Sequence, residues 1–256
     1  MAATSARVLT RLTVTEARIT GRDPASVFFG LAFPTVLLVV LGLVMPWADE
    51  PYDATDPALA GFTVITGYTP VVLALAIATV TLSMFPAVIA AYRANGVLRR
   101  LSTTPLPASR VLVAQILVHV ATLVAGSVVA VVLAWVVLGI TGPRDPLVVL
   151  LAFLLGAGAS IAVGCLIAAW APTTTAATGV SMLVYFVSMF FAGVWTPGPI
   201  MPAAVQAVAA WTPVGAASQA MTAGWLGQGF PAQQLLAMLL WTVVLVPLAA
   251  RLFRWR

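Results

Sequence analysis

The stretch "AYRANGVLRRLSTTPLPASR", residues 91–110, joins two long apolar segments and carries four of the twelve arginines of the chain. The chain is 62% hydrophobic and 7% charged, and its mean hydropathy is +1.08. This composition lies far outside that of soluble domains. The apolar runs are continuous and do not alternate, which argues against a membrane β-barrel. The sequence therefore predicts one transmembrane domain over residues 1–256, an all-α polytopic membrane protein.

Six segments contain the roughly 20 apolar residues that a helix needs to cross a bilayer. We expect transmembrane helices at residues 27–46, 62–91, 109–140, 147–170, 177–195 and 231–250. The connection 47–61 carries four acids and no basic residue, whereas the connection 92–108 carries arginines and no acid. The positive-inside rule then places 92–108 and both termini in the cytoplasm. Eleven of the twelve arginines fall on that side, all except Arg144.

Residues 1–23 read as an amphipathic helix on the inner membrane surface. Its arginines fall within about 60° of one another on a helical wheel. They are Arg7, Arg11, Arg18 and Arg22. Asp23 and Pro24 are typical of a helix N-cap followed by proline, so a new helix should begin there. The interfacial helix can anchor the chain to lipid or dock a partner, and the two roles are compatible.

Residues 196–230 are uncharged and moderately apolar but interrupted by prolines. Proline breaks helices, so we expect short re-entrant helices that dip into the outer leaflet between spans five and six. A seventh span would also place one terminus outside the cell.

Several function classes are disfavoured by what the sequence lacks. The chain has no lysine, so it has no phosphate-binding P-loop, and if the protein does work another chain must supply the energy. No acid lies in the six expected spans, which argues against ion-coupled transport. The single histidine and the single cysteine, His119 and Cys165, are expected to be packing residues and cannot form a metal site alone. We read the net charge of +5 as membrane topology and not as affinity for nucleic acid.

The basic connection 92–108 also contains an apolar pattern that membrane topology does not explain. Val97, Leu98 and Leu101 form an apolar patch beside Arg99 and Arg100, followed by a stop at "TTP". A short helix with an apolar and a basic face, standing away from the membrane, favours docking to a partner.

Two stretches resemble a known family. "YRANGVLRRLSTTPLPASRVLVAQIL", residues 92–117, is similar to the cytoplasmic loop of ABC-2 type permeases, and "FFAGVWTPGPIMPAAVQAVAAWTPVGAASQAM", residues 190–221, is similar to their fifth span and re-entrant helices. The first match rests on Arg93, Gly96, Leu98, Arg99, Leu101, Thr104 and Pro105, and the second on Gly193, Pro197, Pro202 and Pro213. Tyr92 stands where many members have an acid. The loop is most similar to drug-efflux permeases of the daunorubicin-resistance type.

The resemblance implies a bacterial plasma-membrane permease that dimerises with the same or another permease and pairs with two copies of a separate ATP-binding subunit. It implies export of an amphiphilic small molecule by alternating access, with ATP and Mg bound by the partner and no cofactor in this chain. Residues 92–105 would contain the coupling helix. Its contact residues would be Arg93, Gly96, Val97, Leu98, Arg99, Arg100 and Leu101. We expect Leu98 and Leu101 to fill a cleft of the ATPase while the arginines meet its acidic rim.

A substrate path is most readily placed on span five, where methionine and aromatic side chains recur at helical spacing. They are Met182, Tyr185, Phe186, Met189 and Phe190, and helix packing or lipid contact explains the same pattern. Gly156, Ser160 and Gly164 predict close helix packing in span four. Alternatives to a drug exporter are an exporter of a lipid or lipid-linked glycan and a membrane assembly subunit that transports nothing. An enzyme is least supported.

Overall fold

The computed structural model describes residues 2–101, 103, 108–171, 173–196 and 200–252. Within this part of the chain, six helices are long and apolar enough to cross a membrane. They run over Pro24–Val44, Val64–Ala94, Arg110–Leu138, Pro146–Trp170, Thr174–Ala192 and Ala232–Leu252. Each overlaps one predicted span, so the prediction of an all-α polytopic membrane protein is confirmed.

The first two spans each consist of three helical elements. The first contains α2 (Pro24–Val27), η1 (Phe28–Ala32) and α3 (Phe33–Val44), and the second contains α4 (Val64–Ala78), η2 (Thr79–Met84) and α5 (Phe85–Ala94). The other spans are α7 (Ala108–Leu138), α8 (Pro146–Trp170), α9 (Thr174–Ala192) and α12 (Ala232–Leu252). The shorter helices are α1 (Ala2–Thr20), α6 (Val97–Leu101), α10 (Ala203–Ala209) and α11 (Pro213–Leu226).

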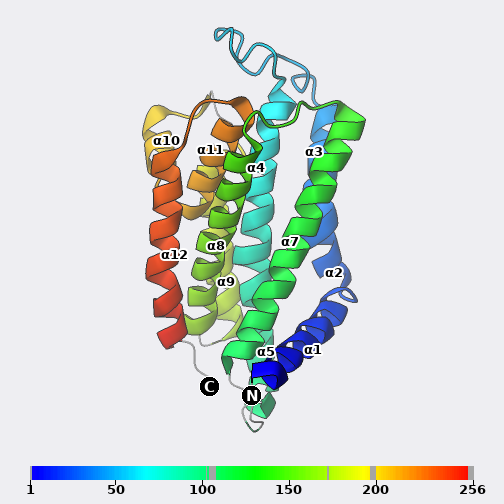
Figure 1. Cartoon of the computed structure of the whole chain (residues 1–256), viewed down its shortest axis with the longest axis vertical. Coiled ribbons are helices and arrows are strands. Elements are labelled where there is room, and N and C mark those ends of the chain that lie inside the picture. Colours follow the sequence, from blue (N-terminus) through cyan, green and yellow to red (C-terminus); the bar gives the residue numbers. More distant parts are fainter. Residues whose placement is uncertain (1, 102, 104–107, 172, 197–199, 253–256) are drawn as a thin grey trace.

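The centre of the bundle is α4. Fourteen of its fifteen residues are buried, so it has no face left for lipid. α8 and α11 pack beside it (Figure 1) and are also mostly buried. In contrast, α3, α7, α9 and α12 expose Val, Leu and Phe side chains. Exposed apolar faces suit helices that contact lipid or another membrane chain.

Two π-helical turns, η1 and η2, interrupt the first two spans. Each ends two residues before a proline, Pro34 in one span and Pro86 in the other. Proline has no N–H, and its ring clashes with the carbonyl four residues earlier in a regular helix. The wider turn relieves this conflict, and the N–H of Phe85 donates to the carbonyl of Val80, five residues back. The prolines therefore mark where regular α-helical bonding is broken.

Small residues on α8 permit two close helix contacts. A Cβ atom on Gly156 would collide with Ala217 of α11, and one on Gly164 would collide with the carbonyl oxygen of Thr81 in η2. Ser160 lies between these glycines and is fully buried. The prediction of a close-packing ridge on span four is confirmed.

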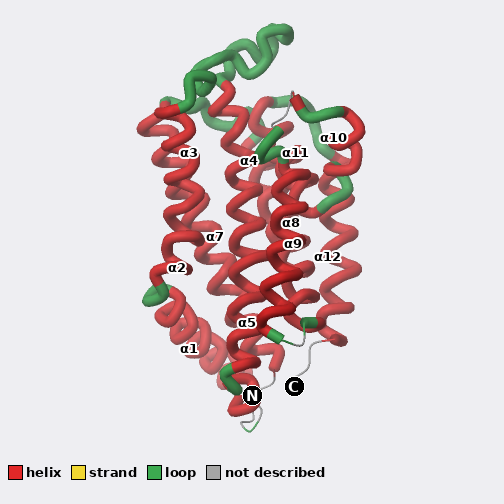
Figure 2. Tube along the Cα trace, turned by 180° about the vertical axis from the view of Figure 1, so that it is seen from behind, coloured by secondary structure: helices red, strands yellow, loops and turns green. Residues whose placement is uncertain are grey.

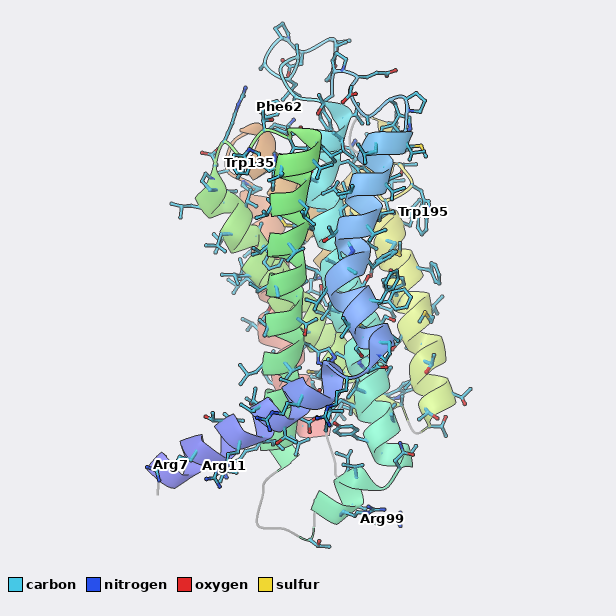
Figure 3. All side chains as sticks on the ribbon, turned by 90° about the vertical axis from the view of Figure 1, so that its right-hand side faces the viewer. Arg7, Arg11, Phe62, Arg99, Trp135 and Trp195 are labelled. Atoms are coloured by element: carbon cyan, nitrogen blue, oxygen red, sulfur yellow. The ribbon has the colours of Figure 1, made fainter. Side chains whose placement is uncertain are left out.

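Both ends of the described chain lie at one end of the bundle (Figures 1 and 2), as an even number of spans requires. We call this end the foot; it comprises α1, α6 and the adjoining ends of α5, α7, α8 and α12. The opposite end, the head, comprises the loop 45–63, α10, α11 and the loop 227–231. Figure 3 shows Arg7, Arg11 and Arg99 at the foot, and Phe62 at the head.

The expected short helices between spans five and six are α10 and α11, of 7 and 14 residues. Gly193 ends α9 in the left-handed conformation, with φ at 84°. Pro202 precedes α10, and Pro213 is the first residue of α11, where a missing N–H is tolerated. Pro197 lies outside the described residues. α11 is buried over ten of its residues, so it belongs to the core of the head.

Candidate functional site

α6 forms the tip of the foot. It follows Gly96, whose φ of 67° is left-handed and lets the chain turn sharply out of α5. Leu98 is 1% exposed, Val97 is partly buried, and Arg99 and Arg100 are exposed. A helix of one turn has one side against the protein, and its apolar residue occupies that side. α6 therefore presents both arginines to solvent, of which Figure 3 labels Arg99.

Leu98 was expected to fill a cleft in a partner; in this structure its side chain packs inside the chain and is not presented at the surface. Leu101 belongs to the same expectation, but its side chain lies outside the described part of the molecule.

Arg93, a predicted contact residue for the partner, makes hydrogen bonds within the chain. Its Nη1 donates to the carbonyl of Ala171 at 2.6 Å, and its Nη2 donates to that of Ala168 at 3.0 Å. The last carbonyls of a helix lack partners within the helix and attract a cation. Arg93 thus binds the end of α5 to the end of α8.

A buried carboxylate joins α1 to two spans. Glu16 is 5% exposed. The hydroxyl of Tyr92 on α5 donates to its Oε2, and Nε2 of Gln115 on α7 donates to the same oxygen at 2.7 Å. At position 92, where the family resemblance expects an acid, a tyrosine thus donates to an acid from α1. The three side chains bring α1, α5 and α7 together at one point.

α1 is the expected separate helix, and Asp23 is the N-cap of α2, accepting from the N–H of Ser26 at 3.0 Å. The Ser26 bonds lower the pKa of the Asp23 carboxyl. Val14 and Ile19 are exposed on α1, and the four predicted arginines are exposed as well, three on α1 and Arg22 in the turn just after it. These are Arg7, Arg11, Arg18 and Arg22. Exposed basic and apolar side chains on one helix suit the surface of an anionic membrane.

The five methionine and aromatic residues predicted to line a substrate path on span five divide into two sets. Met182, Phe186 and Phe190 are exposed, whereas Tyr185 and Met189 turn toward the bundle. The Tyr185 hydroxyl lies 3.1 Å from Oγ1 of Thr79, the first residue of η2. The five residues therefore form no common surface, and only the outward three remain available to a substrate or to another chain.

His119 and Cys165 are buried, as expected of packing residues. Nδ1 of His119 donates to the carbonyl of Gln115 at 2.8 Å, since a carbonyl can only accept, and the ring stands edge-on to Phe85. Among the described residues, no group of three or more His, Cys, Asp or Glu side chains could hold a metal ion.

Sequence reasoning did not single out Glu16 or Gln115. One signal was present for Glu16, because it is the only acid before residue 23 in a segment with four arginines. The burial of Glu16 depends on contacts with Tyr92 and Gln115, which come 76 and 99 residues later in the chain, and no local pattern encodes these contacts.

The bundle of six spans, with exposed arginines on α1, α6 and α12 at its foot, is that of a multi-pass membrane protein. The chain belongs to the ABC-2 type transporter family, whose model matches residues 7–226, from α1 to the end of α11. Permeases of this family are transmembrane transport components and are not themselves catalytic. No curated protein matches the chain.

Proposed function

We propose that this chain is the transmembrane subunit of an ATP-driven exporter that moves a hydrophobic or amphiphilic small molecule out of the cell. The observation that carries the proposal is the exposed pair Arg99 and Arg100 on α6, at the tip of the most buried span. Two copies, or one copy and a related permease, would enclose the path of the molecule and open it to each side in turn.

The energy would come from a separate ATP-binding subunit, bound in two copies. This chain has no lysine and so cannot form a P-loop, and ATP and Mg would be held by the partner. The arginines of α6 would meet an acidic surface of that subunit. Those of α1 lie at the same end of the molecule (Figure 3), beside the same partner or the lipid headgroups.

Contacts at the foot provide a route by which movement of α6 reaches the spans. α6 continues from α5, and Arg93 at the end of α5 holds the end of α8. Tyr92, one residue earlier, holds Glu16 of α1. A displacement of α6 by the ATPase would therefore act on three helices together.

The arginine distribution favours a cytoplasmic foot, and the plasma membrane of a bacterium is the expected location. The outward side chains of α9, Met182, Phe186 and Phe190, would contact either the substrate or the second permease copy. Apolar and polarisable side chains accept varied ligands, which suits a hydrophobic cargo.

The test is purification of the tagged chain from its native membrane in mild detergent, with identification of the proteins that accompany it. We expect a stoichiometric soluble subunit that contains a P-loop. The variant Arg99→Glu with Arg100→Glu should reduce its recovery by roughly tenfold or more, because two attractive contacts become repulsive.

The matched control is Arg251→Glu, an exposed arginine in the last turn of α12, also at the foot. It should leave recovery unchanged. If no P-loop protein accompanies the folded chain, the assembly-subunit alternative is favoured. If the α6 variant and the control retain the ATPase equally, α6 is not the contact.

A further inference from the structure

The head contains a cavity of about 530 Å³, within the size range of small-molecule sites. Its lining comes from the loop 45–63, the end of α9, both head helices, the loop 227–231 and the start of α12. Among the described lining residues one is charged, Asp53, and none is basic. Tyr52, Phe191 and Phe230 provide aromatic surface beside it. A cavity with one negative charge and aromatic walls favours a positively charged ligand.

Three glutamines order the polar wall of this cavity. Gln219 Nε2 donates to the main-chain carbonyl of Gln206 at 2.9 Å, so the amide oxygen of Gln219 must face the other way. That oxygen accepts from Gln234 Nε2 at 3.1 Å. The direction of this chain of bonds leaves Oε1 of Gln234 as an acceptor that no donor among the described residues contacts. The wall therefore offers an acceptor, which suits a ligand with N–H or O–H groups.

Asp53 is held in place and carries its charge. Its Oδ1 accepts from the N–H of Thr55 at 2.8 Å and from the Thr55 hydroxyl at 2.6 Å. These bonds lower the pKa of the Asp53 carboxyl, so it is ionised at neutral pH. The nearby arginine, Arg144, donates to the carbonyls of Leu226 and Ala58 and is not part of the lining.

The tyrosine beside Asp53 is fixed as well. Its ring packs against Gly67 of α4, where a Cβ would overlap the ring. The main-chain N–H of Tyr52 donates to the carbonyl of Phe62 at 2.8 Å. The loop thus holds a carboxylate and an aromatic ring at adjacent positions against the buried central span, so both are set before a ligand arrives.

We propose that the head cavity is a binding site for an amphiphilic organic cation. Its positive centre would lie beside Asp53, its apolar body against Tyr52 and Phe230, and any donor group at Gln234. The inference rests on the proposed function, since it names the chemical class of the exported molecule and the site from which it leaves.

The test measures binding directly and requires no ATPase. The full chain in lipid nanodiscs is dialysed against tetraphenylphosphonium, with empty nanodiscs as the background, and against uncharged triphenylphosphine oxide. We expect saturable binding of the cation and much weaker binding of the oxide. Asp53→Asn should weaken binding of the cation about fivefold, the effect of one partly exposed charge pair.

The matched control is Asp49→Asn, an exposed acid of the same loop that does not line the cavity. It should change the affinity by less than about twofold, because exposed charges at a distance are screened. Gln219→Leu removes both links of the glutamine chain and should also weaken binding, independently of charge.

Binding of the cation that does not exceed the empty-nanodisc background would overturn the proposal. Equal affinity for the uncharged oxide, or equal effects of the two aspartate variants, would overturn it too. None of these three results bears on the ATPase, which the co-purification experiment tests separately. Loss of the ATPase contact in that experiment would leave binding in the head cavity unaffected.

Discussion

Arg93 at the foot and Arg144 at the head both donate hydrogen bonds to main-chain carbonyls, but they join different parts of the molecule. Arg93 reaches carbonyls at the end of α8 at 2.6 and 3.0 Å, and its side chain is partly buried. Arg144 is exposed, and its bonds to the carbonyls of Leu226 and Ala58 measure 3.2 and 3.3 Å. Its guanidinium also lies 4.6 Å from the centroid of the Phe62 ring.

The difference lies in what each arginine holds. Arg93 joins one span to another, so the foot is tied together through its helices. Arg144 joins the end of a helix to a point on the loop 45–63. A segment with long, exposed bonds opens at a lower free energy than one with short, buried bonds. The link that Arg93 makes at the foot is thus expected to open less readily than the link that Arg144 makes to the loop 45–63 at Ala58.

The largest effect is expected from Arg93→Met, which keeps the apolar stem and removes the guanidinium. Two charge-assisted hydrogen bonds are lost, and the free energy of unfolding should fall by roughly 3 kcal/mol. Cys165 is the only cysteine and is buried, so labelling by a thiol-reactive dye during heating reports unfolding. The free energy of unfolding of Arg93→Lys should lie between those of the native chain and Arg93→Met, because a lysine keeps the charge but lacks the planar fork of the guanidinium. A native melting temperature for Arg93→Met would contradict the capping role.

A smaller loss is expected from Glu16→Ala. It leaves the partly buried hydroxyl of Tyr92 and the buried amide of Gln115 without their shared acceptor, at a cost of about 2 kcal/mol. Hydrogen exchange should show α1 becoming less protected while α4 keeps its protection. Glu16→Gln retains a side-chain oxygen and should cost less. If α1 stays as protected as in the native chain, the buried carboxylate does not hold it.

The smallest effect is expected from Arg144→Met, about 1 kcal/mol, the usual contribution of an exposed cation over a ring. The change should appear as faster hydrogen exchange in the loop 45–63, with no change at the foot. Combined with Arg93→Met, the losses in stability should add, since sites at opposite ends of the bundle share no partners. A non-additive double variant would show that the two ends are coupled.

The sequence predicted the spans because membrane hydropathy is a local property. A helix that crosses lipid must be apolar over its whole length, so each span is visible in its own residues. The short helices around Pro202 and Pro213 were predictable for a similar reason, because proline acts on its own neighbours.

The contacts at the foot were not predictable in this way. Arg93 finds carbonyls 75 and 78 residues later in the chain, and the burial of Leu98 is likewise a property of the folded chain that its short helix does not encode. Apolar residues in so short a helix fit a partner's cleft and the protein's own interior equally well. The glutamine chain of the head depends in the same manner on α10, α11 and α12 packing side by side.

The π-helical turn η2 has a consequence for everything that follows it. Such a turn contains one more residue than an α-helical turn, so the helix beyond it is rotated by about 100° from an uninterrupted course. Tyr92 and Arg93 come after η2 and take their directions from that offset. Deleting a single residue within η2 would point both side chains away from Glu16 and from α8. The extra residue thus sets the rotation of the helix end, which carries Tyr92 and Arg93, relative to the core of span two.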